Sequence, residues 1–149
     1  MGLKLAHFLA IAFTAAAMVP GGAHLFAMAA KMGMAQEPYF TVQQIYRGWA
    51  LFGLAIFGAV FANAAVAWMV RDHALPFRFA LAATLILIAT LVVFFLWTFP
   101  ANQATQNWTT APPNWTELRT QWEYSHAANA VMTFLALCLA VLAQLTTRD

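Results

Sequence analysis

Charged residues are scarce in this chain: they make up 8% of its 149 residues, against roughly 25% in an ordinary soluble domain. The net charge is only +2 and no cluster of Lys or Arg occurs, which argues against nucleic acid as a partner. The single cysteine, Cys138, excludes an intrachain disulfide. What remains is 63% hydrophobic, with a mean hydropathy of +0.70. This composition indicates an integral membrane protein. Its expected partners therefore include the lipid bilayer.

The apolar residues form four segments, each longer than the roughly 20 residues that a helix needs to cross a bilayer. We expect helices at about residues 3–30, 42–70, 76–99 and 116–145, with a capping loop at 100–115. The predicted fold is therefore all-α, a single four-helix transmembrane domain over residues 1–149, arranged as an antiparallel bundle. Pro20, Gly21 and Gly22 predict a kink in the first helix.

The placement of Lys and Arg predicts how the bundle is oriented in the membrane. One side of the predicted bundle carries Lys4, Arg71, Arg78 and Arg148. The other side carries Lys31, Arg47 and Arg119, but Arg47 and Arg119 fall inside predicted helices and are weak loop charges. The positive-inside rule then predicts cytoplasmic N- and C-termini and a site toward the outer face.

Four polar or aromatic side chains introduce the last apolar segment: Arg119, Trp122, Glu123 and His126. Their spacing of i, i+3, i+4 and i+7 places all four on one face of a helix. Ionisable groups in a bilayer are costly and usually face the interior of a bundle. An antiparallel arrangement brings this face to the same end as further candidates, which are His24, Tyr46, Arg47, Trp49, Asn102, Trp108 and Trp115.

Three chemistries fit these residues. In metal-free acid–base chemistry, His126 or His24 takes a proton, Glu123 orients the imidazole, and Arg47 or Arg119 with an Asn amide holds an oxyanion. A single transition metal bound by His24, Glu123 and His126 is an alternative, as is a haem b between the two histidines. The chain has too few Glu for a di-iron bundle. In a purely structural alternative, Arg119 and Glu123 form an ion pair along the helix.

Several stretches of the chain resemble one family along nearly its whole length. They are Pro20-Gly-Gly-Ala-His24-Leu-Phe, Ile45-Tyr-Arg-Gly-Trp49, Phe99-Pro-Ala-Asn102 and Trp115-x-x-Leu-Arg119-x-x-Trp122-Glu-x-x-His126. These look like the anthrone oxygenase-like family of small four-helix membrane proteins, most of unknown function. Characterised relatives oxidise an anthrone to an anthraquinone with O₂ and no added cofactor. By position, the resemblance points to His24, Asn102, Arg119, Trp122, Glu123 and His126, and we expect all of these except Trp122 to be catalytic.

We therefore expect a membrane oxidoreductase, a cofactor-independent monooxygenase that acts on a planar phenolic or quinone-like ligand. Aromatic side chains suit such a ligand because they can stack on it. The expected substrate-binding residues are Trp122, Arg47, Tyr46, Trp49, Trp108 and Trp115. A non-catalytic module that holds a metal, haem, quinone or lipid through His24 and His126 is the alternative function. The sequence is also compatible with a homo-oligomer as the functional state.

Overall fold

The structure is a computed structural model that describes residues 2–147, so Arg148, counted above among the inner charges, lies outside the described residues. Within this range the fold is all-helical, as predicted. The α-helices are α1 (Gly2–Met32), α2 (Gln36–Gln43), α3 (Gly53–Met69), α4 (Ala74–Val93), α5 (Phe99–Ala104) and α6 (Trp115–Thr146). Shorter elements are the 3₁₀-helices η1 (Gln44–Tyr46) and η2 (Trp49–Phe52) and the π-helix η3 (Phe94–Thr98).

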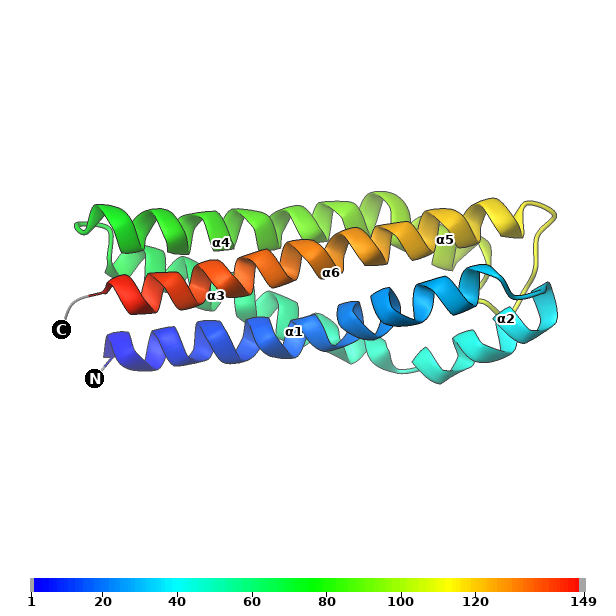
Figure 1. Ribbon diagram of the computed structural model, residues 1–149, viewed down its shortest axis with the longest axis horizontal. Helices are drawn as coiled ribbons and strands as arrows, with labels where there is room; N and C mark the ends of the chain where they lie inside the picture. Colours follow the sequence, from blue (N-terminus) through cyan, green and yellow to red (C-terminus); the bar gives the residue numbers. More distant parts are fainter. Residues whose placement is uncertain (1, 148–149) are drawn as a thin grey trace.

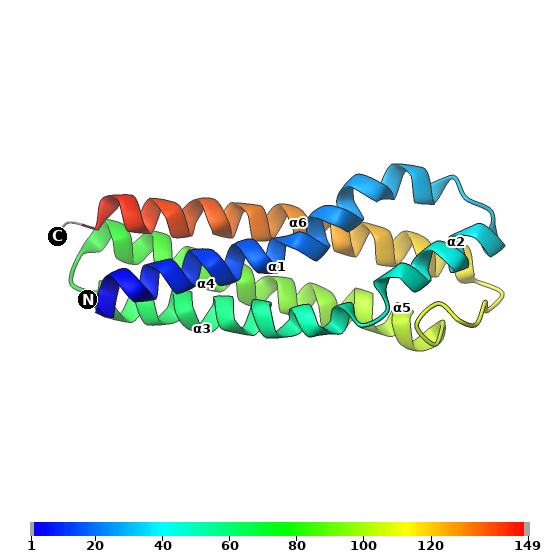
Figure 2. The same cartoon turned by 90° about the horizontal axis from the view of Figure 1, so that it is seen from below.

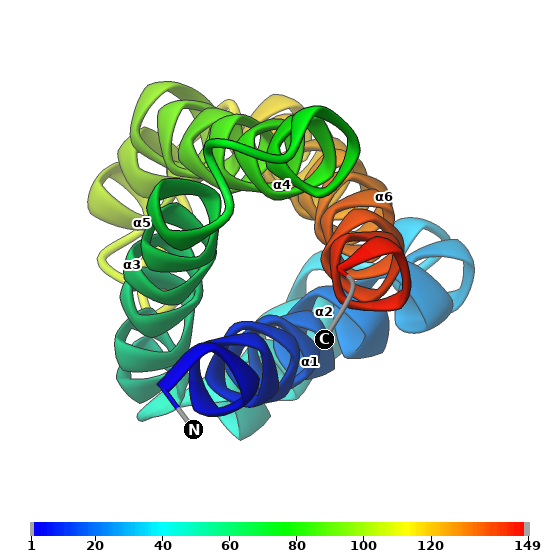
Figure 3. The same ribbon diagram turned by 90° about the vertical axis from the view of Figure 1, so that its left-hand side faces the viewer.

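Four stretches of helix are long and apolar enough to cross a membrane, as predicted from the sequence. They are Gly2–Met32, Trp49–Met69, Ala74–Ala104 and Trp115–Thr146. These helices lie side by side along the long axis, with both ends of the chain at one end and α2 and α5 at the other (Figure 1). Seen end-on, α1, α3, α4 and α6 form a ring in which each helix contacts its two neighbours (Figure 3).

Small residues let these helices approach closely. A buried cluster between α3, α4 and α6 consists of Ala59, Ala83, Leu87 and Ala136. On α1, a Cβ added at Gly21 would stand 3.2 Å from the Cα of Ala130 on α6, which is tighter than most Cβ contacts, so glycine favours this close approach. The α1 helix continues through Pro20 and bends in its second half (Figure 2), as expected where proline removes a backbone donor. Helix contact through small residues is typical of membrane bundles.

The second predicted helix is broken. The sequence suggests one continuous helix over 42–70, but the structure has α2, η1, η2 and α3 in this region, with a turn at Arg47 and Gly48. Gly48 has a φ of 87°, a left-handed conformation that glycine adopts without steric cost. The break moves the chain before it away from the α3 axis, so α2 runs obliquely to α3 at the end of the bundle that carries α5 (Figure 2).

The third predicted helix is longer than expected because it passes through a π-helical segment, η3, into α5. Pro100 lacks an N–H and cannot donate to the carbonyl of Leu96, which disrupts the regular α-helical bonding just before it. Short π segments often occur at functional sites. This one brings Asn102, on α5, toward the same end of the bundle as α2.

Candidate functional site

Two histidines meet inside the bundle at the end that carries α2 and α5. His24 on α1 and His126 on α6 have ring centroids 4.1 Å apart and inclined by 33°. The Tyr46 ring lies 4.1 Å from that of His24, and the Trp122 ring lies 4.2 Å from that of His126. His24 is buried, and its Nδ1 has no hydrogen-bond partner among the described residues. One imidazole nitrogen of this pair is thus enclosed by protein without a hydrogen-bond partner in the described part of the chain.

A cavity of about 800 Å³ adjoins the two imidazoles, a volume that suits a small-molecule ligand. Its walls come from α1, the η1–α3 region, the α4–α5 region and α6. Of the residues singled out from the sequence, those that line it are His24, Tyr46, Arg47, Trp49, Asn102, Trp108, Trp122 and His126. Aromatic faces, an amide and two imidazoles therefore surround one space.

Asn102 is held in one orientation by two indoles. Its Oδ1 accepts hydrogen bonds from Nε1 of Trp122 at 2.7 Å and from Nε1 of Trp108 at 3.2 Å. An indole N–H can only donate, so the amide oxygen must face the two tryptophans. The Nδ2 group of Asn102 therefore remains as a donor at the cavity wall.

A left-handed turn carries Trp108 into the site. Gln106, Asn107 and Trp108 have φ values of 48°, 55° and 62°. Such conformations cost about 1–2 kcal/mol for each residue other than glycine, and strain of this kind tends to occur at functional sites. The Asn107 N–H donates to the Asn102 carbonyl at 2.7 Å, and the Gln44 amide donates to the Trp108 carbonyl at 2.9 Å. These bonds hold the strained turn against α5 and η1.

Behind the aromatic wall lies a buried ion pair that the sequence did not predict. Lys31 Nζ and Glu123 Oε1 are 2.9 Å apart, and both side chains are buried. The Tyr39 hydroxyl donates to the same carboxylate oxygen at 2.9 Å. The Lys31 ammonium also lies 4.9 Å from the Trp122 ring centroid. Glu123 therefore neutralises Lys31, where the sequence suggested that it would orient an imidazole or pair with Arg119.

Burial, reinforced by the Glu123 carboxylate, raises the pKa of the Tyr39 phenol above its ordinary range. The same two causes, with burial again the larger, raise the pKa of Tyr46. Both phenols thus remain protonated at neutral pH. Tyr39 can then act only as the donor in its bond to Glu123, which fixes the direction of that hydrogen bond.

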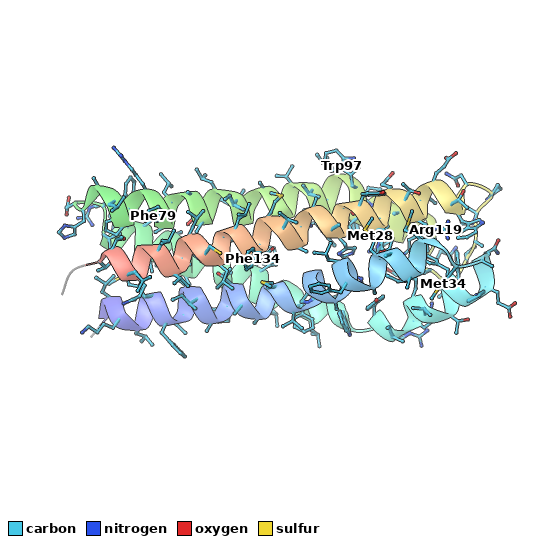
Figure 4. All side chains as sticks on the ribbon, in the orientation of Figure 1. Met28, Met34, Phe79, Trp97, Arg119 and Phe134 are labelled. Atoms are coloured by element: carbon cyan, nitrogen blue, oxygen red, sulfur yellow. The ribbon has the colours of Figure 1, made fainter. Side chains whose placement is uncertain are left out.

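Arg119 does not line the cavity, contrary to its expected role as an oxyanion holder. Its Nη1 donates to the Met34 carbonyl at 2.8 Å, and its guanidinium lies 4.8 Å from the Trp115 ring centroid. Figure 4 shows Arg119 and Met34 together at this end of the bundle. Trp115 is likewise absent from the cavity wall and packs against Arg119 and Tyr39. The cation at the cavity wall is instead Arg47, whose Nη2 donates to Gln44 Oε1 at 2.9 Å.

The sequence placed Lys31 at this end of the bundle as a loop charge. Its burial against Glu123 was not predicted, although Lys31 follows His24 by seven residues and thus shares its helix face. Two further residues at this end were missed. Tyr39 gave no signal, because it lies on a short helix whose position depends on the Gly48 turn. Asn129 lines the cavity with a buried Oδ1 that has no partner among the described residues. Asn129 follows His126 by three residues, so the sequence could have placed it on the same helix face as Arg119, Trp122, Glu123 and His126.

The residues fit a metal or haem poorly in this arrangement. No group of three His, Cys, Asp or Glu side chains that could hold a metal occurs among residues 2–147. The Oε1 atom of Glu123 is engaged by Lys31 and Tyr39. The rings of His24 and His126 contact each other, so a haem between them would require the two helices or rings to move apart. The single metal and the haem therefore stay alternatives predicted from the sequence.

Comparison with known proteins gives no further assignment. No family model, no curated protein and no solved structure matches the chain. The resemblance to the anthrone oxygenase-like family therefore stays a prediction, and the geometry of the site carries the functional argument.

Proposed function

We propose that this protein is a membrane oxidoreductase that resembles anthrone oxygenase and oxidises a planar phenolic substrate with O₂. The observation that carries the proposal is the pair of adjacent imidazoles, His24 and His126, on the wall of an aromatic cavity. Neither ring has a hydrogen-bond partner among residues 2–147, and both residues line the cavity in which a substrate would lie. Tyr46, Trp49 and Trp122 offer faces and edges against which a flat ring can pack.

In the proposed reaction, His126 or His24 removes a proton from a CH₂ group that is activated by the neighbouring aromatic rings. Asn102 Nδ2 and the Arg47 guanidinium stabilise the negative charge on the phenolic oxygen. The electron pair left on carbon passes to O₂, and a carbon–oxygen bond forms. The O–O bond of the resulting hydroperoxide then breaks as the second C–H proton leaves. In sum, CH₂ and O₂ give C=O and H₂O.

We further propose that the four helices form an antiparallel bundle across the bilayer, with the 100–115 region as a cap over the site. Both described ends of the chain lie at the end opposite the cavity (Figure 1), which supports this arrangement. The loop charges favour cytoplasmic termini and a site toward the outer face. An apolar interior is also a medium in which O₂ dissolves well.

Oxygen consumption tests the proposal. The purified protein in lipid nanodiscs is mixed with anthrone, and O₂ uptake is followed with an electrode. We expect His24→Ala/His126→Ala to lower the rate at least about 100-fold, because removal of a general base costs roughly this much. His73→Ala is the matched control, since His73 is exposed at the opposite end of the bundle and should leave the rate unchanged. Equal rates in wild type and double variant would refute the proposal.

One observation favours a second candidate, a non-catalytic module that binds a quinone or lipid. A general base is usually oriented by a partner group, and the carboxylate expected for this task, Glu123, is engaged by Lys31 and Tyr39. If this candidate is correct, the same nanodiscs bind the aromatic ligand in the cavity but consume no O₂ in its presence.

A further inference from the structure

The cavity changes character along its length. At its polar end it is lined by Gln44, Asn102, Gln106, Asn107 and Thr109. At the other end its walls are mostly apolar, with Ala17, Ile56, Leu91 and Thr133. Thr133 follows His126 by seven residues on α6, which is about 10 Å further along the helix axis. The space thus runs from a polar mouth, past the two histidines, toward the middle of the membrane-spanning segments.

One side of this space opens laterally. Phe57 on α3 and Phe95 on η3 both line the cavity, yet 47% and 54% of their surfaces are exposed. Both belong to segments that could cross a membrane, so this exposure faces lipid. The η3 segment packs chiefly against α4, α5 and α6. Gly53 also lines the cavity, and the space beside it is open, because a Cβ added there would meet no atom within 4 Å.

We propose that the ligand enters from the bilayer between α3 and the α4–η3 segment, and that it is a ring-headed amphiphile with one apolar chain. Its aromatic head lies beside His24 and His126, and its chain extends past Gly53 between Phe57 and Phe95. The position of the aromatic head beside the two histidines rests on the proposed function. The class of substrate and its route into the cavity are added to that function.

The lining selects against a phospholipid. Among the described lining residues, Arg47 is the only Lys or Arg, and its guanidinium already donates to Gln44. A phosphate group would lack the cluster of cations that usually binds it. Aromatic rings instead crowd the head position, where the ring of His24 has four others with centroids within 5.8 Å. A flat, uncharged head group matches this environment.

The test compares two probes that differ only in their chain, a dimethoxy-methyl-benzoquinone and its decyl derivative. Their binding to the protein in nanodiscs is measured by quenching of tryptophan fluorescence, since Trp49, Trp108 and Trp122 line the cavity. The variant Gly53→Leu fills the lateral opening. Gly22→Leu is the matched control, because a Cβ at Gly22 also meets nothing within 4 Å, and Gly22 does not line the cavity.

We expect the wild type to bind the decyl probe at least about tenfold more tightly than the short one, because the chain is buried in the opening. Gly53→Leu should remove this preference and leave the affinity for the short probe unchanged, whereas Gly22→Leu should retain it. The inference is overturned if the wild type shows no preference, or if both variants behave alike. Binding is measured without O₂ consumption, so an absent oxidase activity would refute the proposed function and leave this result standing.

Discussion

At the scale of single residues, the site depends on the buried ion pair between Lys31 and Glu123. Lys31 and Glu123 are both excluded from solvent, and Tyr39 supplies an additional hydrogen bond to the carboxylate. A buried ion pair contributes little net stability compared with apolar residues, but the loss of one partner leaves an unpaired charge. The pair therefore fixes the positions of α1, α2 and α6 relative to one another.

Removal of either charge alone should destabilise the protein strongly. We expect Glu123→Gln or Lys31→Met to lower the free energy of unfolding by about 3–5 kcal/mol, because each leaves an uncompensated buried charge. The double variant Lys31→Met/Glu123→Gln should recover most of the loss. Denaturant unfolding in detergent, followed by circular dichroism, measures all three. Additive losses in the double variant would show that the two groups do not act as a pair.

The Tyr39 phenol should make the stability of the folded protein decline at alkaline pH. Its pKa is raised in the folded state by burial and by Glu123, so the folded protein holds this proton more tightly than the unfolded chain does. The resulting stabilisation is fully present below about pH 10 and declines as the pH rises above that value. Thermal unfolding between pH 8 and pH 11, values chosen to bracket the ordinary tyrosine range, should show the decline.

The variant Tyr39→Phe should flatten that alkaline decline, because it removes the titrating group. Tyr124→Phe is the control, since 58% of the Tyr124 surface is exposed. An unchanged decline in Tyr39→Phe would show that another group causes the loss of stability.

At the scale of elements, the Gly48 turn determines how the site is assembled. It ends the α2–η1 segment and begins η2, so Tyr46 and Arg47 reach the cavity from one side of the turn and Trp49 from the other. The sequence showed an apolar, glycine-containing run here and suggested one helix. Glycine alone does not specify a left-handed conformation, and this is why the break could not be predicted.

We expect Gly48→Ala to lower the free energy of unfolding by about 1 kcal/mol, because a Cβ disfavours the left-handed conformation. Added bulk is not the cause, since a Cβ at Gly48 meets nothing within 4 Å. Gly53→Ala is the matched control: Gly53 has a right-handed φ of −54° and open space, so it should show little loss or a slight gain. Equal losses in both variants would contradict this account of the turn.

At the scale of the whole molecule, the sequence predicted the all-helical class and the four long helices, because runs of apolar residues determine both. It also named His24 and His126, which the structure brings into contact. The pairing of Lys31 with Glu123 and the displacement of Arg119 could not be derived, since they depend on where α2 lies at this end of the bundle. That position follows from tertiary packing and one glycine conformation.

The central claim is that the paired imidazoles of His24 and His126 deprotonate a flat substrate held in the cavity. The most direct test is the absorption spectrum of anthrone mixed with the protein in nanodiscs at neutral pH without O₂. We expect the band of the anthrone anion to appear with the wild type and with His73→Ala, and to be absent with His24→Ala/His126→Ala. Anthrone that stays neutral in the wild type, or an equal anion band in the double variant, would contradict the claim.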